Sequence, residues 1–155
     1  MKYNISAVPA TLIDVVWPNI RDMVHEVVKR AHGEMSEETL YNRLLSGNTL
    51  LITISDGPDI IAINTVEVRT FETGMKALYI PVTSGSRLDE WMPDFLEVAR
   101  GIARDFDCTE LRGIAVRPGW LKKLKSEGWE PVHTVIKCDV GADVPVEDTN
   151  LKVVA

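Results

Sequence analysis

The stretch KALYIPVTSGSRLDEWMPDFLEVARGIARDFDC, residues 76–108, decides the fold of this chain. It opens with a strand pattern over 76–82, passes a loop that contains one glycine, and continues as a helix. The apolar residues of that helix fall on one face: Leu88, Trp91, Phe95, Ala99, Ile102 and Phe106. Pro81 lies inside the strand pattern and has no N–H for a sheet ladder, so we expect this strand to be irregular or unpaired on one side near its end.

Two helices and a hairpin are predicted upstream. Apolar residues between 20 and 31 recur at helical spacing, with Pro18 suited to the first turn and Gly33 to a C-terminal cap. A second helix of about ten residues follows Ser36, which offers an N-cap oxygen, and ends at Gly47. Strands over 50–54 and 60–70 flank an Asp-Gly-Pro-Asp turn, and a shift in the apolar phase indicates a bulge near residues 64–65.

The remaining pattern predicts a strand over 110–116, a short helix over 118–127 stopped by Gly128, and a final strand over 132–140. The order α-α-β-β-β-α-β-α-β is typical of an α/β fold with a mixed sheet, built as an antiparallel meander followed by right-handed crossovers. We expect one domain over residues 1–141 with its core at about 10–140. Residues 1–8 and 142–155 are expected to be arms outside this core.

Composition narrows the class of protein. The chain has 155 residues, a formal charge of −6 and 45% hydrophobic residues, which fits one globular domain. Cys108 and Cys138 are expected to be buried free thiols in a reducing compartment, and the absence of a signal peptide or an apolar span predicts a cytoplasmic protein without membrane partners. The acidic balance argues against nucleic-acid binding, and the three histidines lack metal-site spacing, so no metal is expected.

Two segments carry a resemblance to a known family. TSGSRLDEWMPDFLEVARGIARDFDC (83–108) and RPGWLKKLKSEGWEPVHTVIK (117–137) resemble the GNAT N-acetyltransferases, and within them a divergent group encoded by phages and prophages. The resemblance covers about residues 10–140. It implies a GNAT-like acyl-CoA N-acyltransferase fold with acetyl-CoA as the co-substrate and an amine as the acceptor.

The resemblance also implies a cofactor site in the loop after the third strand. The candidate binding residues are Val82, Thr83, Ser84, Gly85, Ser86 and Arg87. This loop departs from the usual family pattern because it has one glycine and its arginine follows that glycine. Serine hydroxyls and the guanidinium can still donate to phosphate at a helix N-terminus. The alternative interpretation is that Ser86 only caps the helix and Gly85 only permits the turn.

Candidate catalytic residues are fewer. Leu124 stands where many family members have a tyrosine that protonates the leaving thiolate. Glu67 is the best-placed carboxylate for a general base and Tyr79 is a possible substitute phenol. The alternatives are that Glu67 is a solvated residue on the polar face of its strand and that Tyr79 packs at the sheet.

Two functions stay open at this stage. As an enzyme, the protein would hold an acyl-CoA between the strands at 76–82 and 110–116 and pass the acyl group directly to an amine, in the cytoplasm of a phage host if the gene is viral. As a catalytically silent phage protein, it would serve in assembly or in the virion, bound to phage structural proteins or to itself. The acidic surface favours a cationic acceptor amine.

Overall fold

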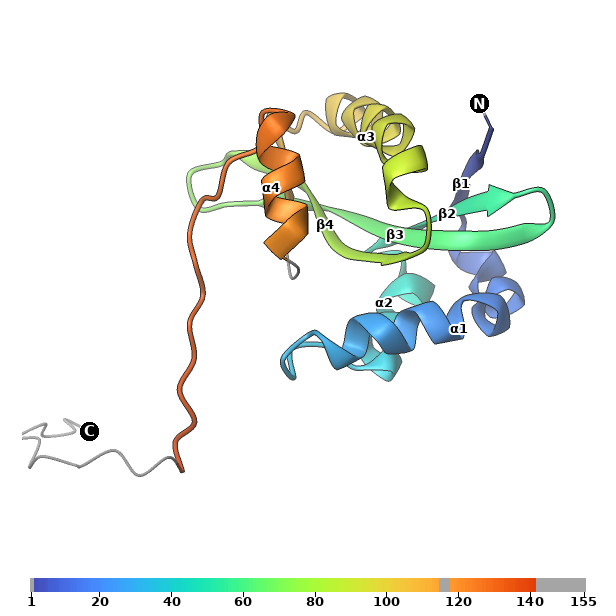
Figure 1. Cartoon of the computed structure of the whole chain (residues 1–155), viewed down its shortest axis with the longest axis horizontal. Coiled ribbons are helices and arrows are strands. Elements are labelled where there is room, and N and C mark those ends of the chain that lie inside the picture. Colours follow the sequence, from blue (N-terminus) through green and yellow to red (C-terminus); the bar gives the residue numbers. More distant parts are fainter. Residues whose placement is uncertain (1, 115–117, 142–155) are drawn as a thin grey trace, which may run out of the picture. The chain divides into compact units, whose positions relative to one another are not determined.

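Five strands form one mixed sheet in the computed structural model, which describes residues 2–114 and 118–141 (Figure 1). The strands lie in chain order: β1 (Asn4–Val8), β2 (Leu50–Asp56), β3 (Asp59–Thr70), β4 (Lys76–Gly85) and β5 (Glu110–Gly113). Neighbours from β1 to β4 are antiparallel, and β5 is parallel to β4. The predicted meander followed by a helical crossover is therefore confirmed.

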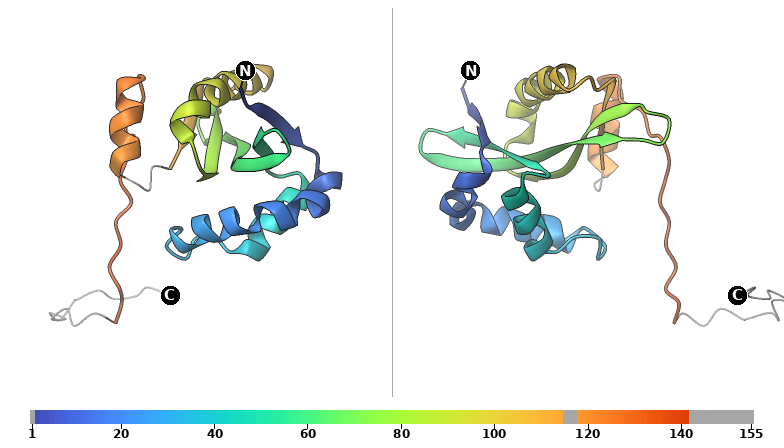
Figure 2. Two further views of the ribbon diagram at one scale, coloured as in Figure 1. Left: turned by 45° about the vertical axis from the view of Figure 1, so that its right-hand side comes forward. Right: turned by 180° about the vertical axis from the view of Figure 1, so that it is seen from behind.

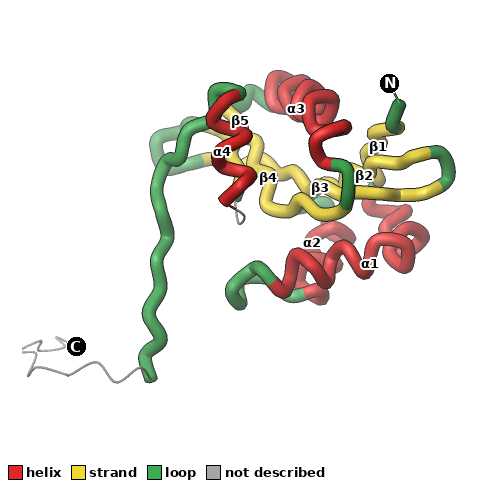
Figure 3. Tube along the Cα trace, in the orientation of Figure 1, coloured by secondary structure: helices red, strands yellow, loops and turns green. Residues whose placement is uncertain are grey.

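Helices cover both faces of this sheet. A short 3-10 turn, η1 (Ala10–Leu12), leads into α1 (Ile13–Lys29), which lies with α2 (Glu37–Ser46) against one face. The long helix α3 (Leu88–Asp105) joins β4 to β5 across the other face, as the turned views also show (Figure 2). Figure 3 shows the same layers with the helices in red and the strands in yellow.

The chain divides into two compact units, residues 1–116 and 117–155. The described part of the second unit contains α4 (Pro118–Ser126). This helix ends before Gly128, whose φ is +90°, and the Gly128 N–H donates back to the carbonyl of Lys125, as the predicted stop requires. Residues 142–155, which include the predicted C-terminal arm, lie outside the described residues, and so do positions 115 and 116 of the predicted strand over 110–116.

The core lies where helical stripes meet the sheet. On the α1 and α2 side its buried residues are Val8, Ile13, Ile20, Val24, Leu40, Leu44, Leu51, Ile63 and Val82. On α3, Trp91 and Phe95 are buried with their ring centroids 6.0 Å apart in an edge-on arrangement. Each fully buried side chain of this size contributes about 1.5–3 kcal/mol, so this packing holds the helices to the sheet.

The N-terminal predictions need two corrections. Residues 4–8 are not part of an arm, because β1 pairs with β2 from Asn4 opposite Ser55 to Val8 opposite Leu51. Helix α1 begins at Ile13, so Pro18 lies inside it rather than in the first turn. The apolar stripe extends upstream through Trp17 to Ile13, and burying it outweighs the single hydrogen bond that Pro18 removes near the helix start.

The predictions for residues 108–140 need two further corrections. Residues 132–140 do not form a strand in the structure. Val135 and Ile136 are 79% and 88% exposed, and the described part of their own unit contains a helix but no strand that could pair with this segment. The cysteines are both free, but Cys108 is half-buried and Cys138 is exposed, so neither is the buried thiol that was predicted. No helix among the described residues is long and apolar enough to cross a membrane.

Helix α2 follows its sequence signals closely. The Ser36 hydroxyl accepts from the Thr39 N–H at 3.1 Å, and the Thr39 hydroxyl accepts from the Ser36 N–H at 3.1 Å. This reciprocal pair is a capping box with threonine in place of the usual Glu or Gln. Gly47 ends the helix with a φ of +78°. Local sequence therefore determines both ends of α2.

Replacing Ser36 by Ala is expected to lower the free energy of unfolding by about 1 kcal/mol, because the cap bond to Thr39 is lost. Urea denaturation followed by circular dichroism measures this loss as a shift of the midpoint at constant slope. Ser46→Ala is the control, since Ser46 is exposed at the other end of the same helix, where its hydroxyl donates to the carbonyl of Arg43 and accepts a long bond of 3.4 Å from the Asn48 N–H. Equal losses from both variants would contradict the capping account.

Candidate functional site

The edge of β4 that faces β5 is only partly used. Pairing with β5 runs from Ala77 opposite Glu110 to Ile80 opposite Gly113, which is directly before Pro81. On the β3 side, the register advances by two residues from Thr65 to Glu67 but by three from Val82 to Tyr79, so β4 carries one extra residue at Ile80–Pro81. The predicted irregularity at Pro81 is confirmed, and the predicted bulge lies one or two residues further along β3 than expected, with its extra residue in β4.

Thr83 presents its backbone to this unpaired edge. The Ser86 N–H donates to the carbonyl of Ile61 at 3.0 Å, which makes these two residues a hydrogen-bonded pair. Hydrogen-bonded and non-hydrogen-bonded pairs alternate along antiparallel strands, so Thr83, opposite Asn64, occupies a non-hydrogen-bonded position. Its N–H and C=O therefore point away from β3. Among the described residues no strand pairs with them, so this edge can receive an extended ligand.

Gly85 is required by the sheet itself. A Cβ at this position would lie 2.4 Å from the Ile61 carbonyl oxygen and 2.5 Å from the Cα of Ala62, and the φ of Gly85 is +121°. Both clashing atoms belong to the backbone, which cannot move aside cheaply. The structural interpretation of this glycine is therefore sufficient by itself, whether or not the loop holds a phosphate.

The other predicted binding residues are brought together, but their side chains have partners inside the protein. Val82 is fully buried in the core. Thr83 donates to the Asn64 side chain at 2.8 Å, Ser84 donates to the carbonyl of Met23 at 2.8 Å, and the Ser86 hydroxyl lies 3.5 Å from the carbonyl of Ile61. Any phosphate here would depend on backbone N–H groups and on Arg87.

Arg87 sits at the start of α3 within a charged network. It occupies the N-cap position with a φ of +58°, so Ser86 does not cap this helix. Its Nη1 donates to Asp56 Oδ2 at 2.6 Å. In the same turn of α3, Glu90 accepts from the Tyr3 hydroxyl at 2.9 Å and from Lys2 at 3.3 Å, and these bonds lower the pKa of Glu90. The positive charge of Arg87 is thus already balanced by Asp56.

The structure places the two predicted catalytic residues side by side. Glu67 is opposite Tyr79 in the β3–β4 register. Glu67 is not solvated on a polar face as one interpretation held, because its side chain is 9% exposed and pairs with Arg43 at 2.7 Å and Arg69 at 3.4 Å. The guanidinium carbon of Arg69 lies 3.6 Å from the centroid of the Tyr79 ring. Glu67 and Tyr79 therefore belong to one ion-paired, stacked cluster.

Sequence reasoning missed the arginines of this cluster. Arg43 comes from α2 and Arg69 from β3, and the β5 register places Arg112 beside Tyr79. Alternation along β3 was a usable signal for Arg69, because residues 67 and 69 share a face of the strand. No local signal connects Arg43 with Glu67, which lies 24 residues further along the chain.

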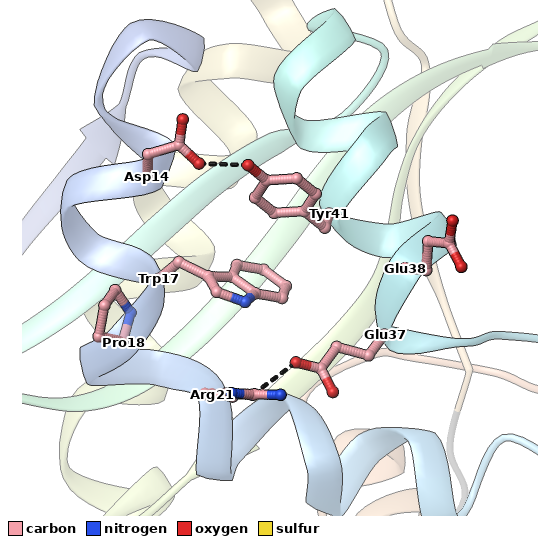
Figure 4. Close-up of a pocket in the computed structure, with 7 residues that line it drawn as sticks. All are labelled: Asp14, Trp17, Pro18, Arg21, Glu37, Glu38 and Tyr41. Atoms are coloured by element: carbon pink, nitrogen blue, oxygen red, sulfur yellow. Dashed lines mark hydrogen bonds and ion pairs between the residues drawn. The ribbon is translucent and has the colours of Figure 1, made fainter.

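A hollow lies between α1 and α2, away from the β4 edge, with a volume of about 490 Å³ (Figure 4). Its polar groups are paired with one another: Tyr41 donates to Asp14, and Glu37 accepts from Arg21 at 2.8 Å and lies 2.6 Å from His25 Nε2. The rings of Trp17 and Tyr41 meet edge-on at 5.1 Å. These contacts fasten the two helices together. Within residues 2–114 and 118–141, no group of three or more His, Cys, Asp or Glu side chains is placed to hold a metal ion.

Comparison with known proteins identifies the fold. No family profile matches the chain, and no curated protein matches it in sequence. Among solved structures, the chain is similar to the aminoglycoside acetyltransferase meta-AAC0020 from an uncultured soil metagenomic sample, in complex with trehalose, with 13% identity and a TM-score of 0.63 over 89% of this chain and 97% of that one.

Two further solved structures have a similar fold. The ribosomal-protein-alanine N-acetyltransferase from Brucella melitensis biovar Abortus 2308 matches at 12% identity and a TM-score of 0.63 over 88% of this chain and 99% of that one. A predicted acetyltransferase with acetyl-CoA from Clostridium acetobutylicum matches at 11% identity and a TM-score of 0.63, over 88% and 96%. At these identities the likeness shows the fold, which is the GNAT acetyltransferase fold expected from the sequence. The resemblance to a phage-encoded group stays a prediction.

Replacing Gly85 by Ala is expected to cost about 3 kcal/mol of stability, because the new Cβ meets β3 backbone atoms and the positive φ is strained. Gly74→Ala is the matched control. The φ of Gly74 is +87°, but a Cβ added there would meet nothing within 4 Å, so only the backbone strain of about 1 kcal/mol applies. Urea denaturation compares the two. Equal costs would show that close packing against β3 is not what requires Gly85.

The ion pairs of Glu37 predict a pH dependence. The hydrogen bond with His25, followed by that with Arg21, lowers the pKa of Glu37. A carboxylate with a lowered folded-state pKa contributes stability above its unfolded pKa and loses it as the pH falls through the folded value. Glu37→Gln should therefore lower the melting temperature at pH 7, and the deficit should shrink below about pH 4. Glu38→Gln, exposed in the same helical turn, controls for the helix dipole. A deficit that persists unchanged at acid pH would refute the prediction.

Proposed function

We propose that this protein is an N-acetyltransferase that binds acetyl-CoA along the unpaired edge of β4 and transfers the acetyl group to an amine. The observation that carries the proposal is that β4–β5 pairing ends at Ile80 among the described residues, and that no described strand pairs with the outward backbone of Thr83 beside the N-terminus of α3. The similarity to solved acetyltransferases supports it, and one of these structures contains acetyl-CoA. The alternative role in virion structure or assembly gains no support from these structures.

The residues present fit acetyl-CoA through backbone groups. The pantetheine arm carries amides that can pair with the N–H and C=O of Thr83 as an added strand would. The pyrophosphate would lie at the start of α3, where backbone N–H groups and the positive end of the helix dipole favour an anion. Arg87 would add a charged donor there, either alongside its pair with Asp56 or after leaving it. The loop side chains at positions 83, 84 and 86 are already bonded within the protein and would contribute little.

The chemistry is direct acyl transfer. The neutral amine nitrogen attacks the thioester carbonyl carbon, the C–N bond forms and the C–S bond breaks. The amine loses one proton, and the departing CoA thiolate takes one up. Holding the two reactants in register along β4 would be the main contribution of the protein, because correct positioning removes much of the entropic barrier.

Tyr79 and Glu67 would act next to this edge. Tyr79 lies two residues before Pro81, so its phenol is the candidate proton donor to the thiolate in place of the family tyrosine, whose position Leu124 occupies. Glu67 accepts hydrogen bonds from the guanidinium groups of Arg43 and Arg69. This geometry suits Glu67 to holding the two arginines in position better than to accepting a proton from the amine.

Acetyl-CoA at millimolar concentration is expected to bind the full chain and to slow hydrogen exchange at the Thr83 amide. Isothermal titration calorimetry and amide exchange by NMR measure these two effects. Arg87→Ala should weaken binding about tenfold, since it removes one charge-assisted contact to phosphate. Asp56→Asn releases Arg87 from an exposed pair that adds little stability, and it should leave binding unchanged or tighter. The proposal fails if acetyl-CoA neither releases heat nor protects Thr83.

A further inference from the structure

Three arginines gather on the sheet face that α1 and α2 share. We name Arg43, Arg69 and Arg112, from α2, β3 and β5, the arginine surface. The strand registers place Glu67, Tyr79 and Arg112 in one row across β3, β4 and β5, and Arg43 reaches this row by its bond to Glu67. Side chains opposite one another in neighbouring strands point to the same face, so the row lies on the side of α2.

Aromatic rings hold two of the three arginines in place. Arg69 stacks on the ring of Tyr79 at 3.6 Å, and Arg112 stacks on the ring of Phe71 at 4.5 Å. A guanidinium that lies flat on a ring keeps the N–H groups at its edge available for oxygen ligands. The described hydrogen bonds use one nitrogen of each guanidinium: Nη2 of Arg43 and Nε of Arg69 bond to Glu67, and Nε of Arg112 bonds to Glu110.

Around Glu67 the cluster shows positive charge to solvent. The cluster contains three arginines and two carboxylates, Glu67 and Glu110, so its formal net charge is +1. Glu67 is 9% exposed, whereas the side chains of Arg43 and Arg69 are 46% and 39% exposed. The Glu67 carboxylate is therefore buried beneath Arg43 and Arg69, which form the accessible positive layer. In the Arg112–Glu110 pair the carboxylate is the more exposed partner, at 42% against 21%. The chain as a whole carries −6, so this patch opposes the overall field.

The position of the arginine surface connects it with acyl transfer. Tyr79 and Arg112 form the register pair directly before Ile80 and Gly113, where β4 and β5 stop pairing. An amine that reaches an acyl group at the edge beyond Ile80 would have the remainder of its molecule within reach of these arginines.

We infer that the arginine surface binds an anionic oxygen group of the acceptor, so that the acceptor is an amine that also carries a carboxylate or a phosphate. That the bound molecule is an acetyl acceptor rests on the proposed function. That the surface binds an anion rests on the arginine surface alone. This inference is the opposite of the expectation from the net charge of the chain, which favours a cationic acceptor amine. Guanidinium groups match both carboxylate and phosphate in two-point geometry, and the experiment separates these two sources.

Anion binding is tested without any acyl transfer. Succinate and inorganic phosphate are titrated in turn into the full chain, and NMR follows the side-chain Nε–H signals of its arginines. Signals of Arg69 and Arg112 should shift with at least one anion, while that of Arg100 should not. Arg100 is the matched control because it is an exposed, ion-paired arginine on α3, against the other face of the sheet. No shift, or equal shifts at Arg100, would overturn the inference.

Acceptor choice is tested by kinetics with acetyl-CoA. The amines are matched for size: butylamine, 4-aminobutanoate and 1,4-diaminobutane, with ethanolamine and phosphoethanolamine as a second pair. Wild type should favour an anionic amine over its neutral partner by about tenfold or more in kcat/KM, because each charge-assisted bidentate contact is strong. Arg43→Gln should bring the ratio of kcat/KM between the anionic and the neutral amine close to one, and Arg100→Gln should leave both this ratio and the rate with butylamine intact.

The outcomes separate the two claims. Transfer that prefers 1,4-diaminobutane or butylamine over both anionic amines overturns the inference and leaves the proposed acetyltransferase standing. Absence of transfer to every amine, together with anion-dependent shifts at Arg69 and Arg112, overturns the proposed function and supports the anion-binding surface. Preference for 4-aminobutanoate identifies a carboxylate acceptor, and preference for phosphoethanolamine identifies a phosphate acceptor.

Discussion

The missing N–H of Pro81 is the constraint on which the rest of the candidate site depends. A proline cannot donate to a ladder, so β4 gains an extra residue at Ile80–Pro81 and its pairing with β5 stops at Ile80. Beyond this point, among residues 2–114 and 118–141, β4 is paired with β3 alone. An unpaired strand edge normally invites association with another chain, and here it lies beside the start of α3, where an anion can also be held. One residue thus turns an ordinary sheet edge into a place for an extended, phosphate-bearing ligand.

The loop after β4 illustrates how structural and functional demands coincide. Gly85 must be glycine because β3 backbone atoms occupy the space of a Cβ. The hydroxyls of Thr83 and Ser84 tie β4 to β3 and to α1. These contacts hold the strand end rigid and leave ligand binding to the backbone of Thr83 and to Arg87. A sparse glycine pattern is therefore compatible with a cofactor edge, because close packing of β4 on β3 accounts for the one glycine present.

Local charge and global charge differ in this protein. An acidic chain of −6 presents a cationic layer at one place, because α2, β3 and β5 each contribute an arginine and Glu67 is buried under two of them. Short-range contacts decide what binds at a site, since exposed charges separated by more than about 8 Å are largely screened at physiological salt. The chemistry of an acceptor has to be judged from the side chains around the end of β4–β5 pairing rather than from composition.

The sequence by itself determined the elements whose information is local: the amphipathic stripes of α1 and α3, both ends of α2, the β2–β3–β4 meander, the irregularity at Pro81 and, through residues 83–108 and 117–137, the GNAT fold. Tertiary structure alone decided that residues 4–8 form an edge strand, that residues 132–140 do not form a strand, and that Glu67 is buried by Arg43. Helix periodicity and capping act within a few residues, so a window of sequence contains them. Strand pairing and ion pairing join residues tens of positions apart, and their energy exists only once the chain has brought those residues together.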